Sequence, residues 1–145
     1  MDKVHVFLAT PISGCADGAE YHDLRTRIIE LIGRLRVEGF EVFSEIEEIL
    51  DENSYDSPGD SVKKDFENIQ KSYAFVMYHP RRMQSSTLIE LGFAYAQEKK
   101  IIIVGSLSDL PYLVHGFQEV RSNVHIIDSA ILDDATIAEI IKRIK

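Results

Sequence analysis

Glu90 is the residue of this sequence whose setting most needs a chemical explanation. It is the only charged residue between Ser85 and Gln97. A carboxylate among side chains that become buried costs free energy unless it is hydrogen-bonded. An oriented carboxylate is also a group that can attack the anomeric carbon of a sugar. We therefore interpret Glu90 as the nucleophile of an enzyme that cleaves glycosidic bonds.

A structural role for Glu90 stays open on the local pattern alone. Thr87-Leu88-Ile89-Glu90 matches the capping box, in which Thr and Glu side chains bind each other's backbone amides at the start of a helix. The two roles are compatible, because the helix dipole and free amides at a helix N-terminus hold a carboxylate in its ionised form.

Other polar residues have both a plain and a functional interpretation. Asp65 is a solvated charge on a helix face or a second acidic group of the site. The run from Thr10 to Gly14 is a turn after a strand, or it offers backbone N–H groups and hydroxyls to a sugar or phosphate. The residues from Ser85 to Thr87 begin a helix and would seat a phosphate. Arg81 and Arg82 are surface charges or attract that phosphate.

Several classes of function are excluded by missing patterns. The G-x-G-x-x-G spacing and the P-loop sequence are absent, which argues against dehydrogenases, kinases and ATPases. Cys15 is the sole cysteine, so an internal disulfide and a thiolate-rich metal site are ruled out. The five histidines show no metal-ligand spacing. We therefore expect no metal and no cofactor.

The composition is that of one globular domain spanning residues 1–145, with 45% hydrophobic and 28% charged residues. The formal net charge of −8 disfavours binding to nucleic-acid polymers, which rely on clustered Lys and Arg. The chain begins without the apolar core of a signal peptide, and no apolar run approaches the roughly 20 residues needed to span a bilayer. We expect a cytoplasmic protein that does not bind membranes.

Alternating strands and helices must position these residues. Short apolar runs predict five strands, at 4–9, 40–43, 73–78, 101–104 and 124–127. Helical periodicity and caps predict four helices, at 21–37, 60–71, 85–98 and 133–145. Gly39 is placed to end the first helix, and Asp133 or Asp134 to cap the last. The polar stretch from Ser44 to Gly59 reads as a surface excursion with one helical turn near Ile46 to Leu50.

Strands that are apolar throughout indicate a parallel sheet with helices on both faces. The simplest topology is a doubly wound, flavodoxin-like or Rossmann-like α/β fold with strand order 2-1-3-4-5. Ligands bind such sheets at the carboxyl ends of the strands, where the strand order reverses. Here that point lies between the first and third strands, where three loops converge: residues 9–17, the excursion after Phe43, and residues 79–87.

Taken together, the segments resemble the nucleoside 2-deoxyribosyltransferase family, including its 2′-deoxynucleoside 5′-monophosphate N-hydrolase branch. Phe7-Leu8-Ala9-Thr10-Pro11-Ile12-Ser13-Gly14 is similar to the family's first strand and sugar-side loop. Lys64-Asp65-Phe66 resembles its conserved-Asp helix. Ser86-Thr87-Leu88-Ile89-Glu90-Leu91-Gly92-Phe93-Ala94 is close to its nucleophile motif. The resemblance extends from about Val4 to Ile127.

The resemblance implies that Glu90 attacks C1′ of a nucleoside or nucleotide, releases the base and forms a covalent glycosyl-enzyme. Asp65 would hold sugar hydroxyls or orient Glu90. The residues expected to bind substrate are Phe7, Ala9, Pro11, Ile12, Ser13, Gly14, Arg81, Gln84, Ser85, Ser86 and Thr87. Members assemble as dimers or larger oligomers with a neighbour's Asn near the site, and Asn123 resembles that residue.

The departures from the family pattern favour hydrolysis of a monophosphate over base exchange. Gln84 stands where related transferases carry an Asp that handles the base proton, and Ser86 replaces a usual Gly. The loop from His79 to Gln84 contains Arg81 and Arg82, which suit a 5′-phosphate together with the nearby serines. His79 would then supply a proton, since an unperturbed imidazole titrates near pH 6.5.

Three alternatives stay open: a nucleoside 2-deoxyribosyltransferase proper, an NAD glycohydrolase of the Toll/interleukin-receptor type, and a nucleotide-binding module without catalytic activity. The fold alone does not decide between them.

Overall fold

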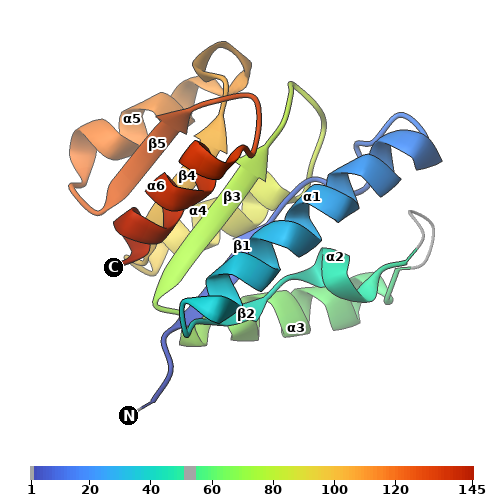
Figure 1. Cartoon of the computed structure of the whole chain (residues 1–145), viewed down its shortest axis with the longest axis horizontal. Coiled ribbons are helices and arrows are strands. Elements are labelled where there is room, and N and C mark those ends of the chain that lie inside the picture. The colour runs from blue at the N-terminus through green and yellow to red at the C-terminus, as the bar shows by residue number, and fades with distance from the viewer. Residues whose placement is uncertain (1, 51–54) are drawn as a thin grey trace.

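The computed structural model of the chain describes residues 2–50 and 55–145. Its strands are β1 (His5–Ala9), β2 (Glu41–Phe43), β3 (Ala74–His79), β4 (Lys100–Gly105) and β5 (Val124–Asp128). Its helices are α1 (Gly18–Val37), α2 (Glu45–Glu48), α3 (Pro58–Lys71), α4 (Thr87–Ala96), α5 (Tyr112–Val120) and α6 (Asp134–Ile144), with a 3₁₀ turn at Leu107–Asp109. Figure 1 labels these elements.

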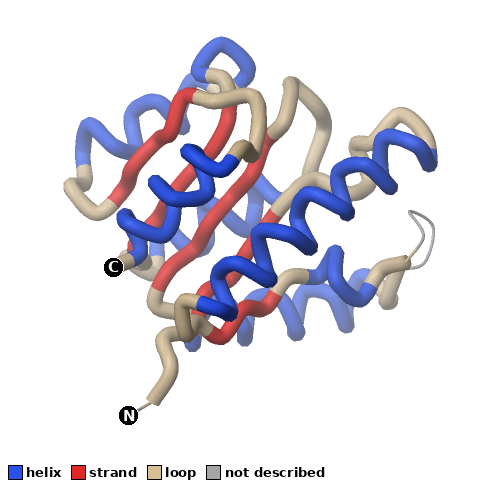
Figure 2. Tube along the Cα trace, in the orientation of Figure 1, coloured by secondary structure: helices blue, strands red, loops and turns tan. Residues whose placement is uncertain are grey.

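The five strands form one sheet in the order β2-β1-β3-β4-β5, and every neighbouring pair is parallel. In the central pair, Val6 lies opposite Ala74 and Ala9 opposite Met77. The predicted doubly wound fold and strand order are confirmed. Because β1 lies between β2 and β3, the carboxyl ends of these three strands release their loops side by side (Figure 2).

Helices cover both faces of the sheet. In Figure 1, α1 and α6 lie on the near face, while α3, α4 and α5 lie behind it. Each layer buries its own hydrophobic cluster, one including Ile28 of α1 and Ile140 of α6, the other including Ile69 of α3 and Leu91 of α4. Burying apolar area on both faces is what makes the apolar strands stable in the interior of the molecule.

The helix boundaries follow from local capping. Gly39 has a φ of +95°, which only glycine adopts readily, and its amide donates to Arg36 at the end of α1. Asp133 caps α6 by accepting from the amide of Thr136 at 2.8 Å, as predicted. Ser57 caps α3 through the amide of Asp60. The sequence reasoning assigned no helix to residues 112–120, where α5 covers β5.

No helix among the described residues is long and apolar enough to cross a bilayer.

Candidate active site

A cavity of about 290 Å³ opens at the carboxyl edge of the sheet, where the strand order reverses. Residues from the loop after β1, from α2, from the segment 55–66 and from the start of α4 line it. They are Thr10, Ile12, Ser13, Glu45, Tyr55, Pro58, Ser61, Val62, Asp65, Phe66, Ser85, Ser86, Thr87, Ile89 and Glu90. The structure therefore brings Glu90 and Asp65 to one cavity at the predicted position. Residues 51–54 of the predicted excursion lie outside the described part of the chain.

The first turn of α4 presents Glu90 to the cavity. The helix begins at Thr87, and its N-cap residue Ser86 makes no side-chain cap bond. The amide of Thr87 instead donates to the hydroxyl of Ser85 at 3.0 Å. Glu90 is then the fourth residue of the helix, so the capping box that would join Glu90 to Thr87 does not form. This removes the structural explanation for the Glu90 side chain.

The packing of α3 against α4 places Asp65 beside Glu90. The rings of Phe66 and Phe93 stack with centroids 4.4 Å apart, which fixes the two helices against each other. Asp65 adjoins Phe66 in the sequence, and its side chain lines the same cavity as those of Glu90 and Glu45. It is only 7% exposed. Asp65 is therefore part of the site, and the interpretation of Asp65 as a solvated surface charge is wrong.

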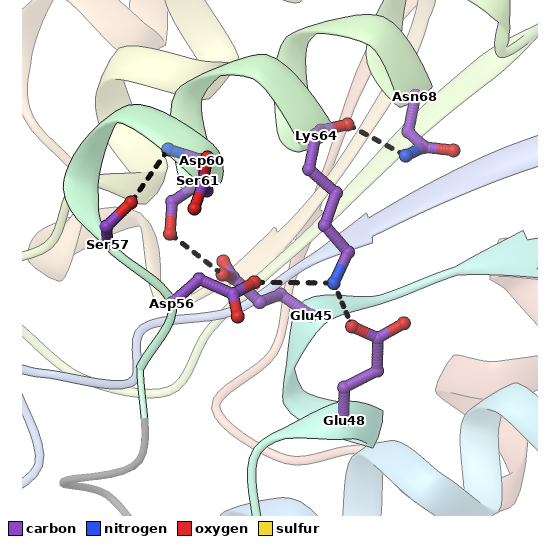
Figure 3. Close-up of polar contacts among 8 residues, drawn as sticks. All are labelled: Glu45, Glu48, Asp56, Ser57, Asp60, Ser61, Lys64 and Asn68. Carbon is purple, nitrogen blue, oxygen red and sulfur yellow. Dashed lines mark hydrogen bonds and ion pairs between the residues drawn. The ribbon is translucent and has the colours of Figure 1, made fainter.

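A third carboxyl group, which the sequence reasoning missed, comes from α2. Glu45 lies directly after Ser44 at the end of β2, and the hydroxyl of Ser61 donates to its Oε1 at 3.5 Å (Figure 3). The ammonium of Lys64 holds α2 against α3 by pairing with Glu48 and, at 3.5 Å, with Asp56. The signal that could have identified Glu45 is its position immediately after a strand that ends at the switch point.

Burial raises the pKa of all three carboxyl groups, and Asp65 raises those of the two glutamates further. Burial, followed by the charge of Asp65, raises the pKa of Glu90 to about 9 and that of Glu45 to about 7. Burial also raises the pKa of Asp65, against the hydrogen bonds that favour its ionised form. The expectation that the helix dipole keeps Glu90 ionised is therefore wrong for the free protein, since desolvation and two neighbouring acids outweigh the dipole.

The loop after β1, predicted to contact the sugar, forms one wall of the cavity. The hydroxyl of Thr10 donates to the carbonyl of Tyr78 at 3.0 Å and ties the ends of β1 and β3 together. Ile12 and Ser13 line the main cavity. Phe7 and Ala9 lie deeper, where with Glu45 and Glu90 they border a hole of about 20 Å³.

Pro11 is buried and lies outside the cavity linings. Gly14 packs so closely on the loop after β3 that a Cβ there would meet the carbonyl oxygen of Gln84 at 2.2 Å.

A second, more open hollow of about 630 Å³ adjoins the first and shares Ser13, Ser85, Ser86 and Ile89 with it. Arg81 and Gln84 also line it. The guanidinium of Arg81 donates to Glu20 at 2.7 and 3.2 Å and to the carbonyl of Gly14 at 3.3 Å. Arg82 points elsewhere and donates to the carbonyl of Ser108 at 2.7 Å. Of the two arginines, Arg81 alone is in this hollow.

His79 is not brought to the site. It is the last residue of β3 and not part of a loop, and it is 1% exposed. It borders none of the cavities described above, and its buried Nδ1 meets no hydrogen-bond partner. Burial also lowers the pKa of the imidazole, which keeps it neutral at physiological pH. The burial of His79 outside the cavity and its lowered pKa do not fit the predicted role of a proton donor.

Asn123 lies at the opposite edge of the sheet, since it precedes β5 and Glu90 follows the carboxyl ends of the strands. Its amide donates to the carbonyl of Glu98 at 3.3 Å and to that of Lys99 at 3.1 Å. It borders a separate hollow of about 590 Å³ at this amino edge. Within one chain, Asn123 does not contribute to the Glu90 cavity.

Among the described residues, no group of three or more His, Cys, Asp or Glu side chains is arranged to hold a metal ion.

Solved structures of other proteins share this fold. The structure of the CMP N-glycosidase BcmB from Clostridium botulinum is 26% identical to this chain, matches 96% of each chain and superposes with a TM-score of 0.67. The solution structure of BlsM is 23% identical, covers 97% of this chain and 86% of BlsM, and has a TM-score of 0.68.

The TIR domain heterodimer of RPS4 and RRS1 is more distant, at 14% identity and a TM-score of 0.57, over 97% of this chain and 94% of the TIR chain. At these identities, BlsM and the TIR domain show a shared fold alone. No protein-family model matches the sequence, and a search of curated proteins found no match.

Proposed function

We propose that this chain cleaves the N-glycosidic bond of a nucleoside 5′-monophosphate, with Glu90 as the nucleophile. The observation that carries the proposal is the Glu90 carboxyl group, which lines a cavity at the switch point of the sheet beside a second buried acid, Asp65. A pair of carboxyl groups around a cavity is the arrangement that glycoside cleavage uses. The cavity volume of about 290 Å³ suits the sugar and base of a nucleotide.

The likeness to a CMP N-glycosidase supports the same bond and the same class of substrate. The two chains are 26% identical, and the match covers 96% of each. BcmB acts on CMP, as its name states, so CMP is the first substrate to test. The shared fold of a TIR domain gives no comparable support for NAD cleavage.

In the proposed reaction, the Glu90 carboxylate attacks C1′ of the sugar, the bond from C1′ to the base breaks, and a covalent glycosyl-enzyme results. Asp65 accepts hydrogen bonds from the sugar hydroxyls and orients Glu90. Water then attacks C1′, releases the sugar phosphate and restores the Glu90 carboxyl group. Gln84 cannot act as the acid that handles a base in related transferases, which supports hydrolysis over base exchange.

The adjoining hollow is the proposed phosphate site. Ser13, Ser85 and Ser86 line both cavities, and Arg81 is the arginine among the described residues that borders this hollow. Hydroxyls, backbone amides at the start of α4 and a guanidinium are the groups that bind phosphate. The phosphate would then sit beside the cavity that holds Glu90, at one end of the substrate.

The test is to incubate the purified protein with CMP, other ribonucleoside and deoxyribonucleoside 5′-monophosphates, the matching nucleosides, and NAD, each with and without an acceptor base. We expect free base and sugar phosphate from monophosphates, at rates that an acceptor base does not change. The Glu90→Gln variant should lose at least about 10⁴-fold in kcat. Mass spectrometry of the wild-type protein during turnover should detect a glycosyl adduct on Glu90.

The other outcomes identify the alternatives. Exchange of bases on unphosphorylated nucleosides would assign a deoxyribosyltransferase. Release of nicotinamide from NAD alone would assign an NAD glycohydrolase. Binding of CMP without release of base from any substrate would assign a nucleotide-binding module and overturn the proposal.

A further inference from the structure

Glu45 faces the same enclosed space as Glu90. Both side chains line the main cavity and the small hole beneath it. Glu45 reaches this position from α2, after the end of β2, while Glu90 comes from α4. Asp65 of α3 lines the same cavity, near enough for its charge to raise the pKa of both glutamates. Figure 3 shows the Glu45 side chain directed towards Ser61 of α3, away from the Lys64 ammonium.

No positive side chain neutralises this cluster from within. None of the described residues lining the Glu90 cavity is a lysine, arginine or histidine. The charge of Lys64 lowers the pKa of Glu45 from outside the cavity lining, but its ion pairs are with Glu48 and Asp56. Three adjacent carboxyl groups in a partly buried site cannot all be ionised without a large cost, so protons must neutralise part of the cluster.

Asp65 gives independent evidence for such protons. Its Oδ1 is buried and has no hydrogen-bond partner among the described residues. A proton on Glu45 or Glu90 supplies the missing donor, with Asp65 as the ionised acceptor. Buried polar atoms are almost always hydrogen-bonded, which makes this the favoured state of the free protein.

The departing base needs a proton that the predicted donors do not supply. His79 is buried outside the cavity, and the Gln84 amide is not an acid. We propose that Glu45 is the general acid that protonates the departing base, and that Glu90 replenishes it through Asp65. This inference rests on the proposed glycosidase function and adds a second catalytic residue to it.

Protons and electrons balance in the first step. The electron pair of the bond between C1′ and the base nitrogen moves onto the base, and the base takes the proton of Glu45. Glu90 passes its proton to Asp65, Asp65 passes one to Glu45, and the Glu90 carboxylate forms its bond to C1′. In the second step, water attacks C1′, the bond from C1′ to Glu90 breaks, and the relay returns the water proton to Glu90.

The pKa values agree with this order of events. Burial and the charge of Asp65 raise the pKa of Glu45 to about 7, which suits proton donation near neutral pH. The pKa of Glu90 is raised to about 9, so Glu90 carries a proton to pass on. The charged groups that face Glu45 from α3, α4, α2 and the preceding segment are Asp65, Lys64, Glu90, Glu48 and Asp56.

The experiment compares Glu45→Gln with the wild-type protein on two substrates. CMP releases a base that needs protonation, whereas 4-nitrophenyl ribofuranoside 5-phosphate releases a phenolate that does not. We expect Glu45→Gln to lose about 10²–10⁴-fold in kcat/KM on CMP and less than about fivefold on the nitrophenyl substrate. Glu47→Gln is the matched control, because Glu47 is on the same helix but pairs with Arg36 outside the cavity.

The pH profile with CMP gives a second readout that a merely structural role would not change. Wild-type kcat/KM should fall as pH rises through about 7, where Glu45 loses its proton. Glu45→Gln should lack this fall, and Glu47→Gln should retain it.

A Glu45→Gln variant that keeps this fall, or stays within about threefold of wild type on CMP, overturns the role of Glu45 while leaving Glu90 as the nucleophile. A wild-type protein without any turnover overturns both proposals.

Discussion

At the scale of single residues, Glu90 links activity to stability. A glutamate whose pKa rises from 4.5 to about 9 on folding binds more protons in the folded than in the unfolded state between those values. The free energy of unfolding must then fall as pH rises across this window. The slope for a single proton is at most about 1.4 kcal/mol per pH unit. The acid proposed to do the chemistry therefore makes the free protein less stable above neutral pH.

Replacing Glu90 with Gln should remove much of this pH dependence. The amide has the size of the carboxyl group and can donate to Asp65, so the fold should tolerate it. We expect a flatter plot of unfolding free energy against pH between about 5 and 9, measured by urea denaturation, and a Tm within a few degrees of wild type at pH 7. A variant that loses activity but keeps the wild-type pH slope would contradict the pKa assigned to Glu90.

Arg81 and Arg82 offer a matched pair for the phosphate site. Arg81 borders the hollow beside Glu90, and Arg82 binds the carbonyl of Ser108 outside it. We expect Arg81→Gln to lower kcat/KM for CMP by about 10- to 100-fold, the value of a charge-assisted hydrogen bond, with little effect on cytidine. Arg82→Gln should leave both unchanged.

Loss of the ion pair with Glu20 is a second effect of the Arg81 substitution. The Glu20→Gln variant separates the two, because it weakens the pair and keeps the guanidinium. If Glu20→Gln lowers kcat/KM for CMP as much as Arg81→Gln does, the arginine stabilises the loop and does not bind the phosphate.

At the scale of elements, the contact between Gly14 and Gln84 sets the spacing of two loops. A Cβ at Gly14 would lie 2.2 Å from the backbone oxygen of Gln84, so the loops must separate to accept it. We expect Gly14→Ala to raise KM for CMP at least severalfold, because Ser13 and Ser85 would move apart, with a smaller effect on kcat. Gly33→Ala on α1 is the control, since nothing lies within 4 Å of its added Cβ. Equal kinetics for both variants would contradict the role of this contact.

The elements that could be predicted from the sequence are those with a clear pattern of apolar and polar residues. The apolar strands and the helix around Glu90 show their periodicity directly, and strand order follows from their alternation. Glu45 has no such signal. Its segment, Glu45-Ile46-Glu47-Glu48, has the composition of a solvated turn. Tertiary contacts hold this segment in place: Arg25 of α1 donates to the carbonyl of Ile46, and Lys64 of α3 pairs with Glu48.

Two other predictions depended on where a strand begins or ends. β3 extends one residue beyond the predicted boundary, which buries His79 instead of exposing it in a loop. Asn123 directly precedes β5 and therefore lies at the amino edge of the sheet. In a parallel sheet, this follows from its position in the sequence alone. The resemblance placed Asn123 near a site only through a neighbouring subunit.

At the scale of the whole molecule, self-association remains a prediction. Apolar side chains of α4 and α5 are open to solvent, including Ile89 at 67% and Leu113 at 74% exposure. Ile89 also borders both cavities of the site, so a second copy on this face would close them. We expect analytical ultracentrifugation to give at least twice the monomer mass of 16.5 kDa.

Leu113→Glu should shift this mass towards the monomer and lower the rate of CMP cleavage. Val37→Glu provides the control, since Val37 is 86% exposed at the end of α1, on the other side of the sheet. A monomeric wild-type protein would end the expectation of a homo-oligomer.

The helices on the two faces of the sheet contribute unequally to the Glu90 cavity. Among the described residues, those lining the Glu90 cavity come from α2, α3, α4 and the adjoining loops, and none comes from α1 or α6. Apart from the α1 side chains that hold the site, such as Glu20 with Arg81 and Arg25 with α2, the α1–α6 layer can be redesigned for heat tolerance by better surface charges or fuller packing. Directed evolution of new substrate ranges could keep that layer as a constant stabilising platform while it randomises the opposite one.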